Sequence, residues 1–449
     1  MNKRYSMLFS VTAVAVLAAT LFGSTYTQSQ LAGSTMAASS SDDLVSKIHS
    51  MGGLKLVMPQ AFAAVDCANI EDGRNVVEFN LTGESVDLPV IGGGTYKAMT
   101  FSGQVPGPTL RVTQGDVVMM TLTIPDDELT PHGNDMHASE MSASYFGKVL
   151  PGQSTTYCYV AQVPGTFKYH CSGVDVAAMD QHVLSGMYGM TIVDPLNGYK
   201  PLVVDKTAVK DGKVVRDRQI YSADALEFQL QYNQLYLTEG GNYDQGAMFN
   251  HDTTWTVVNG MSFGYVPNAA HNELILGDAK KNIFVAQPWN SPDLKQYQSQ
   301  LLFIEAGQKT RLFIENQGNE PVFFHIVGEI IDRVVQANVV QAKGTETWMV
   351  GGSQGMIADV VFDEPGVYVA VNHDYAAIFT GAASVFVVGD PFNLNAQLGT
   401  NAKSYAELLG NPSDAVPPMG KNSIAHPMLN LHGLYTDERA EEIKAELGI

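Results

Sequence analysis

Cysteine is scarce in this chain of 449 residues, which contains only Cys67, Cys158 and Cys171. So few cysteines exclude a scaffold held together by many disulfides. No Cys-x-x-Cys-His sequence occurs, which excludes a covalently attached c-type haem. Charge is scarce as well: charged residues make up 16%, and 26 basic residues face 46 acidic ones, a formal net charge of −20. A surface of this sign argues against nucleic acid as a partner.

Long hydrophobic runs are missing except near the N-terminus. Lys3 and Arg4 precede an apolar stretch over residues 7–22, and small polar residues follow it. The stretch is short for a membrane span and is typical of a signal peptide, with a retained anchor as the alternative. We expect residues 1–37 to be a signal peptide and the protein to be exported, to the periplasm or beyond. The cleavage position stays open, because Ala61-Phe62-Ala63 also has the small-x-small pattern.

An internal repeat indicates two copies of one β-fold. The segment 110–115, Leu-Arg-Val-Thr-Gln-Gly, matches 302–307, Leu-Phe-Ile-Glu-Ala-Gly, at an offset of 192 residues. Later, Pro164-Gly165 precedes His170 much as Pro365-Gly366 precedes His373. Short alternating strands separated by Gly and Pro turns, in a chain that is 45% hydrophobic, favour a pair of β-sandwiches.

The turn-rich segment 194–198 marks the joint between the two copies. Polar lead-in residues precede the first copy, a Pro-containing insertion interrupts the second, and a tail with a short charged helix at 437–447 follows it. We therefore expect a lead-in over 38–75, a first domain over 76–195, a second over 196–390 with an insertion at 266–298, and a tail over 391–449.

One short region combines three kinds of metal-binding side chain. Tyr169-His170-Cys171 is followed by His182 and Met187. A thiolate, an imidazole and a thioether from one loop are the ligand set of a blue-copper electron-transfer site, and thiolate and thioether are soft ligands that suit Cu(I). Such a site needs a second histidine, for which His132 is a candidate.

His170 indicates a second metal beside the first. Neighbouring side chains on a strand point to opposite faces, so Cys171 can face one metal while His170 faces another. On an extended segment Asp135 and His137 share a face, and Asp135 is a candidate for handling protons. Two metals joined by one peptide unit predict redox catalysis.

The second copy cannot repeat the thiolate site. Asp374 stands where the first copy has Cys171, but His373 remains on the matching strand, and His325 lies one residue past the equivalent of His132. We expect His373 to complete a metal site across an interface.

Taken together, these motifs resemble the copper-containing nitrite reductases, and among them the outer-membrane-type branch. The resemblance covers about residues 100–390. It is carried by Phe101–Arg111, His132-x-x-Asp135-x-His137, Tyr169-His170-Cys171, His182-x-x-x-x-Met187-Tyr-Gly189, Phe324–Asp332 and Val371-Asn-His373.

The resemblance implies an all-β fold of two tandem cupredoxin-like Greek-key β-sandwiches, with one type 1 and one type 2 copper per chain. His132, Cys171, His182 and Met187 would bind type 1 copper. His137 and His170 would bind type 2 copper together with His373 of the neighbouring subunit in a homotrimer. Asp135 and His325 would be the acid–base pair over nitrite, and Val327 would shape the substrate pocket. Ten residues separate Cys171 from His182, more than is usual in the family, so the colour of the type 1 site and its contact with the donor stay open.

The implied reaction is the reduction of nitrite to nitric oxide by one electron and two protons, with a cupredoxin or a c-type cytochrome as electron donor. A two-domain multicopper oxidase is one alternative, although Ser172 after Cys171 does not fit the histidine-rich trinuclear centre of an oxidase. A non-catalytic blue-copper electron carrier is another, but it would leave His325, Asp135 and His373 without a role. We expect the five remaining histidines to be ordinary ones. A Cys67–Cys158 disulfide is possible in an oxidising compartment.

Overall fold

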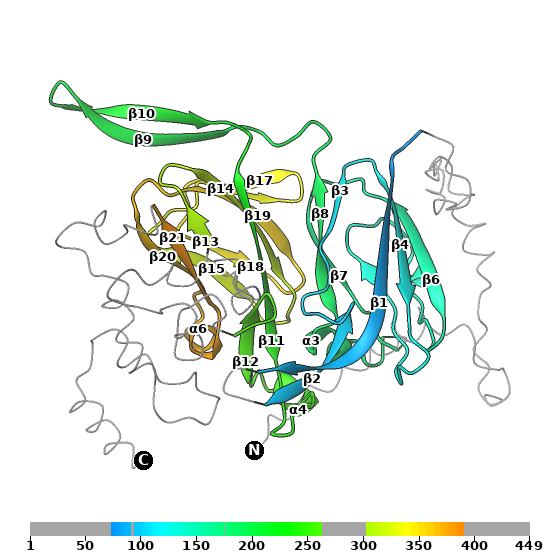
Figure 1. Ribbon diagram of the computed structural model, residues 1–449. Coiled ribbons are helices and arrows are strands. Elements are labelled where there is room, and N and C mark those ends of the chain that lie inside the picture. Colours follow the sequence, from blue (N-terminus) through cyan, green and yellow to red (C-terminus); the bar gives the residue numbers. More distant parts are fainter. Residues whose placement is uncertain (1–72, 91–93, 175, 263–301, 390–449) are drawn as a thin grey trace, which may run out of the picture. The chain divides into compact units, whose positions relative to one another are not determined.

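The computed structural model describes residues 73–90, 94–174, 176–262 and 302–389 (Figure 1). The predicted signal peptide, the insertion, the tail and nearly all of the lead-in lie outside these residues. Cys67 also lies outside them, so its bridge to Cys158 stays a prediction. Within the described part, no helix has both the length and the apolar character needed to cross a membrane.

The first domain is a sandwich of two four-stranded sheets. One sheet has the order β2-β1-β4-β6 and the other β3-β8-β7-β5. The strands and the helix that connects two of them are β1 (Val76–Pro89), β2 (Thr95–Phe101), β3 (Leu110–Thr113), β4 (Val117–Thr123), β5 (Asp135–Met136), β6 (Ser154–Val160), β7 (Gly165–His170), α3 (Met179–Leu184) and β8 (Tyr188–Asp194). A 3₁₀ turn spans Ala143–Tyr145.

The second domain pairs a six-stranded sheet, β12-β11-β14-β19-β16-β17, with a five-stranded one, β13-β21-β20-β15-β18. The strands of the first are β11 (Leu226–Leu235), β12 (Trp255–Val258), β14 (Lys309–Asn316), β16 (Arg333–Gln336), β17 (Val339–Ala342) and β19 (Gly355–Val361). Those of the second are β13 (Leu302–Ile304), β15 (Val322–Val327), β18 (Thr347–Val350), β20 (Gly366–Asn372) and β21 (Ala383–Val388), and two short helices are α4 (Gln245–Phe249) and α6 (Tyr375–Thr380).

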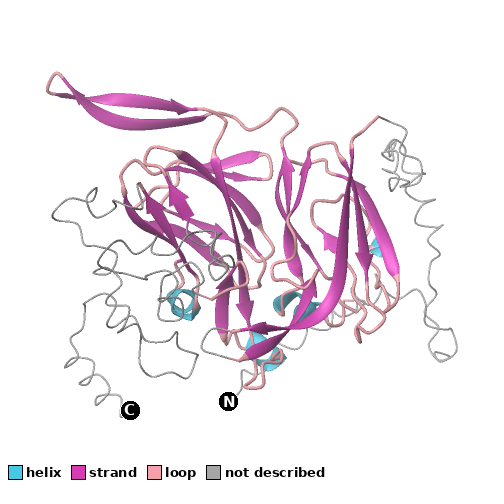
Figure 2. Ribbon diagram, viewed as in Figure 1, coloured by secondary structure: helices cyan, strands magenta, loops and turns pink. Residues whose placement is uncertain are grey.

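The predicted all-β fold of two sandwiches is confirmed, and Figure 2 shows how far strands dominate the described chain. The repeated segments fall on equivalent elements, because β3 and β4 of the first domain correspond to β13 and β14 of the second. Alternation explains the packing of these strands: Val118, Met120 and Leu122 of β4 are fully buried in the first core. That core also contains Cys171 and Met187, so two predicted copper ligands belong to the hydrophobic interior.

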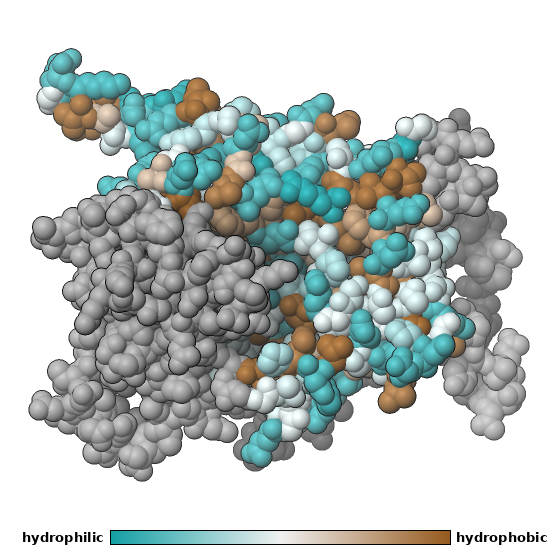
Figure 3. Space-filling model, viewed as in Figure 1, coloured by the Kyte–Doolittle hydropathy of each residue, from teal (hydrophilic) through white to brown (hydrophobic). Residues whose placement is uncertain are grey.

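A two-stranded hairpin, β9 (Leu202–Lys210) and β10 (Lys213–Tyr221), follows the joint between the domains. Its base packs on the second domain, where Leu202 and Val204 contact Val361. Near its tip, Val209 and Val214 pair across the strands and are 71% and 73% exposed. Figure 3 shows both polar and apolar atoms on the surface of this hairpin.

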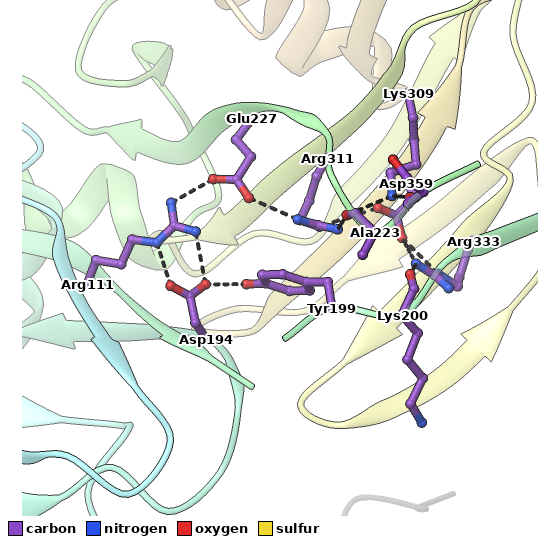
Figure 4. A network of polar contacts seen from close by, with 11 residues as sticks. Arg111, Asp194, Tyr199, Lys200, Ala223, Glu227, Lys309, Arg311, Arg333 and Asp359 are labelled. Carbon is purple, nitrogen blue, oxygen red and sulfur yellow. Dashed lines mark hydrogen bonds and ion pairs between the residues drawn. The ribbon is translucent and has the colours of Figure 1, made fainter. Parts of the chain in front are cut away.

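A polar network joins the two domains (Figure 4). Arg111 of β3 makes a two-pronged ion pair with Asp194 and reaches Glu227 of β11 at 2.6 Å. Glu227 in turn accepts a bond from Arg311, whose guanidinium lies over the ring of Tyr199, 3.5 Å from its centroid. The joint between the sandwiches is therefore fixed by directional bonds between both domains.

Candidate metal centres

Three predicted ligands converge at the end of the first sandwich. His132 precedes β5, Cys171 follows β7 directly, and His182 lies on α3. The Nδ1 atoms of the two histidines lie 3.2 Å apart, and the Cys171 Sγ atom lies 3.2 Å from His182 Nδ1 and 3.8 Å from His132 Nδ1. All three side chains are buried. The three ligand atoms therefore lie close enough together to bind one metal ion.

Met187 is tied to the same cluster through the backbone. Its N–H donates to the carbonyl of His182, and its carbonyl accepts from the N–H of Cys171, both at 3.0 Å. Its side chain is fully buried in the core that contains Cys171. The loop from Cys171 to Met187 thus closes on itself, and α3 is the element that turns His182 inward.

The Cys171 sulfur accepts two backbone hydrogen bonds, from Gly133 at 3.5 Å and from Gly173 at 3.2 Å. A Cβ atom at Gly133 would lie 2.1 Å from the Ser172 hydroxyl oxygen, so a larger residue there would have to displace the Ser172 side chain. Burial raises the pKa of the Cys171 thiol to about 11, and the two N–H groups oppose that rise. A metal that binds the thiolate must therefore displace a proton, which cationic copper can do.

A second cluster forms beside the first, from Asp135, His137 and His170. The Nε2 atoms of His137 and His170 face each other at 3.0 Å, and an Asp135 oxygen lies 3.8 Å from His170 Nε2. The Nδ1 atom of His170 lies 2.8 Å from the carbonyl of Cys171. Because a carbonyl only accepts, His170 carries its proton on Nδ1 and presents the Nε2 lone pair to the cluster.

Burial also sets the protonation of this second cluster. Desolvation raises the pKa of Asp135, which favours its protonated form, and the nearby charges of His137 and Lys168 oppose the rise. Desolvation lowers the pKa of His137 and brings that of His170 to about 3. The two imidazoles are thus neutral and able to bind a metal, while the carboxyl is poised to hold a proton.

Both donor sets fit copper. The first combines two imidazole nitrogens, a thiolate and a nearby thioether, which suits a blue-copper centre, and the second offers imidazoles with an adjacent carboxyl. Neither group has enough oxygen ligands for calcium or magnesium. In each cluster two imidazole nitrogens lie 3.0–3.2 Å apart. Two nitrogen lone pairs repel at this distance unless a cation or a proton lies between them, and this observation supports the fit.

The metal-free protein is expected to lose stability as the pH falls. Burial lowers the pKa of His132 and of His182 to about 4, so the unfolded chain binds more protons than the folded one below the ordinary histidine value. Their contribution is complete above about pH 6.5 and is lost between about 6.5 and 4. The free energy of unfolding of the copper-free His182→Gln chain, measured with urea, should depend less steeply on pH in this window than that of the unchanged chain. The difference in slope should correspond to about one bound proton. An unchanged slope would contradict the prediction, and the exposed His251, changed to Gln, is the control.

The structure places the remaining predicted site residues in the second domain. His325 lies on β15, and its Nδ1 atom is 2.8 Å from the carbonyl of Glu346, while Val327 at the end of β15 is 49% exposed. His373 follows β20, is exposed, and has its ring centroid 5.1 Å from that of His325. Among the described residues, neither histidine belongs to either first-domain cluster of the same chain.

Sequence reasoning missed a buried lysine behind the second cluster. Lys168 shares a strand face with His170, and its ammonium donates to the Gln317 carbonyl at 2.6 Å and to the Ser353 hydroxyl at 3.2 Å, both in the other domain. Burial lowers its pKa to about 8, and the charges of Glu315 and Asp135 oppose that shift. Glu315 is fully buried, and neither of its oxygens has a hydrogen-bond partner among the residues that the structure describes. The sequence signal that could have revealed this residue is a lysine at an inward-facing position of a core strand.

Lys168→Met should therefore destabilise the protein strongly. It removes the charge that opposes the raised pKa of Glu315, so this fully buried carboxyl loses the compensating charge that Lys168 provides. Leaving a buried charge uncompensated costs about 3–5 kcal/mol. Denaturant unfolding should show that loss, and the double variant with Glu315→Gln should recover most of it. Lys206→Met, which breaks a partly exposed pair with Asp363, should cost no more than about 1 kcal/mol. Equal losses in the two single variants would refute this role.

Comparison with known proteins agrees with this geometry. The sequence model of the family described as multicopper oxidase matches residues 85–198, which is most of the first sandwich and the joint. A copper-containing nitrite reductase from Rhizobium sullae is 29% identical over 352 residues, 76% of this chain and 82% of that protein. One from Alcaligenes faecalis is 28% identical over 72% of this chain and 78% of that protein.

Solved structures extend the likeness to the fold. The copper nitrite reductase from Nitrosomonas europaea has 27% sequence identity and a TM-score of 0.55, and the match covers 71% of this chain and 96% of that one. A multicopper oxidase at 21% identity and a TM-score of 0.52 shares the fold alone. The fold and the clusters thus define a two-domain cupredoxin protein. The predicted resemblance is confirmed: this chain is similar to copper-containing nitrite reductases over most of its length.

Proposed function

We propose that this chain is a copper-containing nitrite reductase that forms nitric oxide. The observation that carries the proposal is the pair of ligand clusters joined through one peptide unit, with Asp135 beside the second cluster. Copper held by the residues of the two clusters would supply one-electron redox chemistry and, at the second cluster, a binding site for the nitrite anion. Nitrite takes up one electron and two protons, one N–O bond breaks, and nitric oxide and water are released.

In this proposal the residues of the second cluster have different roles. His137 and His170 are neutral imidazoles that would hold the metal. Asp135 holds a proton within reach of the reacting oxygen, as its raised pKa supports. His170 also gives the shortest covalent route to the first cluster, because its backbone continues directly into Cys171 and its Nδ1–H bonds the Cys171 carbonyl.

A second copy of the chain completes this site in the proposal. The face around His373 and His325 is apolar and exposed: Phe323 is 38%, Met349 57% and Tyr375 66% exposed. Phe323 and Met349 pair across β15 and β18, and the Tyr375 ring lies 5.4 Å from that of His373. An apolar surface that surrounds two histidines is suited to burial against another subunit. A ring of such contacts, a homotrimer, brings His373 and His325 to Asp135 and His137 of the next subunit.

The proposal includes export of the protein and a small redox protein as donor to the first cluster. Both rest on the sequence, on the N-terminal pattern and on the blue-copper ligand set, which serves electron transfer between proteins.

The decisive experiment is anaerobic incubation of the copper-loaded protein with nitrite and a reductant, with detection of nitric oxide. Metal analysis should give two coppers per chain. Oxygen consumption with four coppers per chain would instead identify an oxidase. One copper per chain with reversible electron transfer and no nitric oxide would identify a carrier.

Asp135→Asn should keep both coppers and lose rate by about 10²–10⁴-fold, because the amide preserves shape but cannot deliver a proton. The pH dependence of nitrite reduction should flatten as well, since the group with the raised pKa is gone. Asp180→Asn is a matched control, because the Asp180 carboxylate is turned toward Tyr243 and Gln245. An unchanged pH–rate profile in Asp135→Asn would show that Asp135 is only structural.

A further inference from the structure

We propose that Glu128 is a positioning residue for His132, and that its carboxylate tunes the electron-accepting centre through its negative charge beside the outer nitrogen of this ligand. The inference rests on the proposed function in one respect: it requires copper at the cluster of His132, Cys171 and His182. It adds a residue that the ligand motifs do not contain.

The Glu128 carboxylate is held rigidly before it meets the histidine. One of its oxygens, Oε2, accepts from the Ser85 N–H at 2.6 Å. The other, Oε1, accepts from the Ser85 hydroxyl at 3.1 Å and from the N–H groups of Leu129 and Thr130 at 3.0 and 3.1 Å. The side chain is only 7% exposed. Four donors therefore fix a nearly buried carboxylate at one place.

The second ring nitrogen of His132 is turned toward this carboxylate. Its Nδ1 atom faces Cys171 and His182, which leaves the ring proton on Nε2 when Nδ1 binds a metal. The Nε2 atom is buried, has no hydrogen-bond partner in the described structure, and lies 3.8 Å from Glu128 Oε1. A buried N–H without an acceptor is costly. The Glu128 oxygen lies beyond hydrogen-bond distance at 3.8 Å, but its negative charge is close enough to stabilise the positive end of this N–H.

Carboxylate–histidine–metal arrangements fix the tautomer and orientation of the ligand and raise its basicity. A negative charge held there stabilises the more positive oxidised state of copper over the reduced state. Glu128 therefore lowers the reduction potential of the first centre and orients His132 for binding. The rest of the family motif, His132-x-x-Asp135-x-His137, begins after this residue, so the motif alone does not reveal it.

The test compares Glu128→Gln with Asp180→Asn in the full copper-loaded chain. Each variant removes one carboxylate charge near a histidine ligand, but Asp180 bonds Tyr243 and Gln245 and does not contact the ligand rings in the described contacts. Reduction potential is followed by spectroelectrochemistry of the copper–thiolate band, and Cu(II) and Cu(I) affinities by competition with chelators.

We expect Glu128→Gln to weaken Cu(II) relative to Cu(I) about 10–100-fold, the usual effect of losing such a partner. Tenfold corresponds to a rise of about 59 mV in the potential of a one-electron couple. Asp180→Asn should shift the affinity ratio less than about twofold. An unshifted Glu128→Gln, or equal shifts in the two variants, would overturn the inference.

A second variant and a check on the unchanged chain complete the experiment. If Glu128→Gln does not fold, Glu128→Asp withdraws the carboxylate from Nε2 and should shift the potential in the same direction; no shift would refute the positioning role. If the unchanged chain binds no copper at Cys171, the proposed function itself fails. If it forms the coloured centre and turns over nitrite while Glu128→Gln leaves the potential unmoved, only this inference fails.

Discussion

Replacing His137 by alanine is expected to reduce nitrite turnover by on the order of 10⁴-fold or more, because the change removes one of two facing imidazoles from the second cluster. The first cluster should be unaffected, since its candidate ligands are His132, Cys171 and His182 and do not include His137. The variant should therefore keep its copper–thiolate absorption and still accept an electron from a reductant. Absorption, copper content and nitric oxide production measured on one sample separate these effects.

His251→Ala is the matched control for this change. His251 is exposed, bonds Glu320 in the second domain, and belongs to neither cluster, so its removal should leave turnover within about twofold of the unchanged chain. Full activity of a His137→Ala protein that demonstrably lacks the second copper would refute the assignment of catalysis to this cluster.

Mixed oligomers of two inactive chains are expected to regain activity. One chain carries His137→Ala and the other His373→Ala, so each homo-oligomer lacks one imidazole at every site. In a heterologous ring each site combines the first domain of one subunit with the second domain of the next. A site is intact where the first domain comes from the His373→Ala chain and the second domain from the His137→Ala chain.

Random mixing in equal amounts should make about one quarter of the sites intact, and activity should recover to about that fraction of the unchanged protein. Refolding the two chains together, with differential tags to prove co-assembly, gives the measurement. Proven mixed oligomers without recovered activity would sink the shared-site proposal. So would a fully active monomer in light scattering, because His373 does not join the His137 cluster within one described chain.

Local spacing carried most of the information about the first centre. Cys171, His182 and Met187 belong to one loop, so their convergence needs no distant contact, and the structure closes that loop with the bonds of Met187 to its two neighbours. Strand alternation likewise sufficed to predict that His170 and Cys171 face different clusters. The repeat of 110–115 at 302–307 was enough to predict two sandwiches, because the same turn and alternation recur on β3 and β13.

The environments of these ligands could not be predicted in the same way. Glu128 reaches its position through bonds to Ser85, 43 residues earlier, and Lys168 reaches the Gln317 carbonyl, 149 residues later. Contacts between residues so far apart in the sequence leave no periodic pattern in it. They are created by packing between different elements and not by the spacing of residues along one element.

The sequence by itself thus determined the ligand types, their order, and the two-sandwich frame that carries them, since all of these follow from residue chemistry and short-range period. Only the tertiary structure decided which imidazole nitrogens face each cluster and which buried charges stand behind them. It also placed His373 on an exposed face of the same chain. The physical reason is burial: desolvation sets the pKa of Asp135, His170 and Lys168, and burial exists only once distant strands have packed.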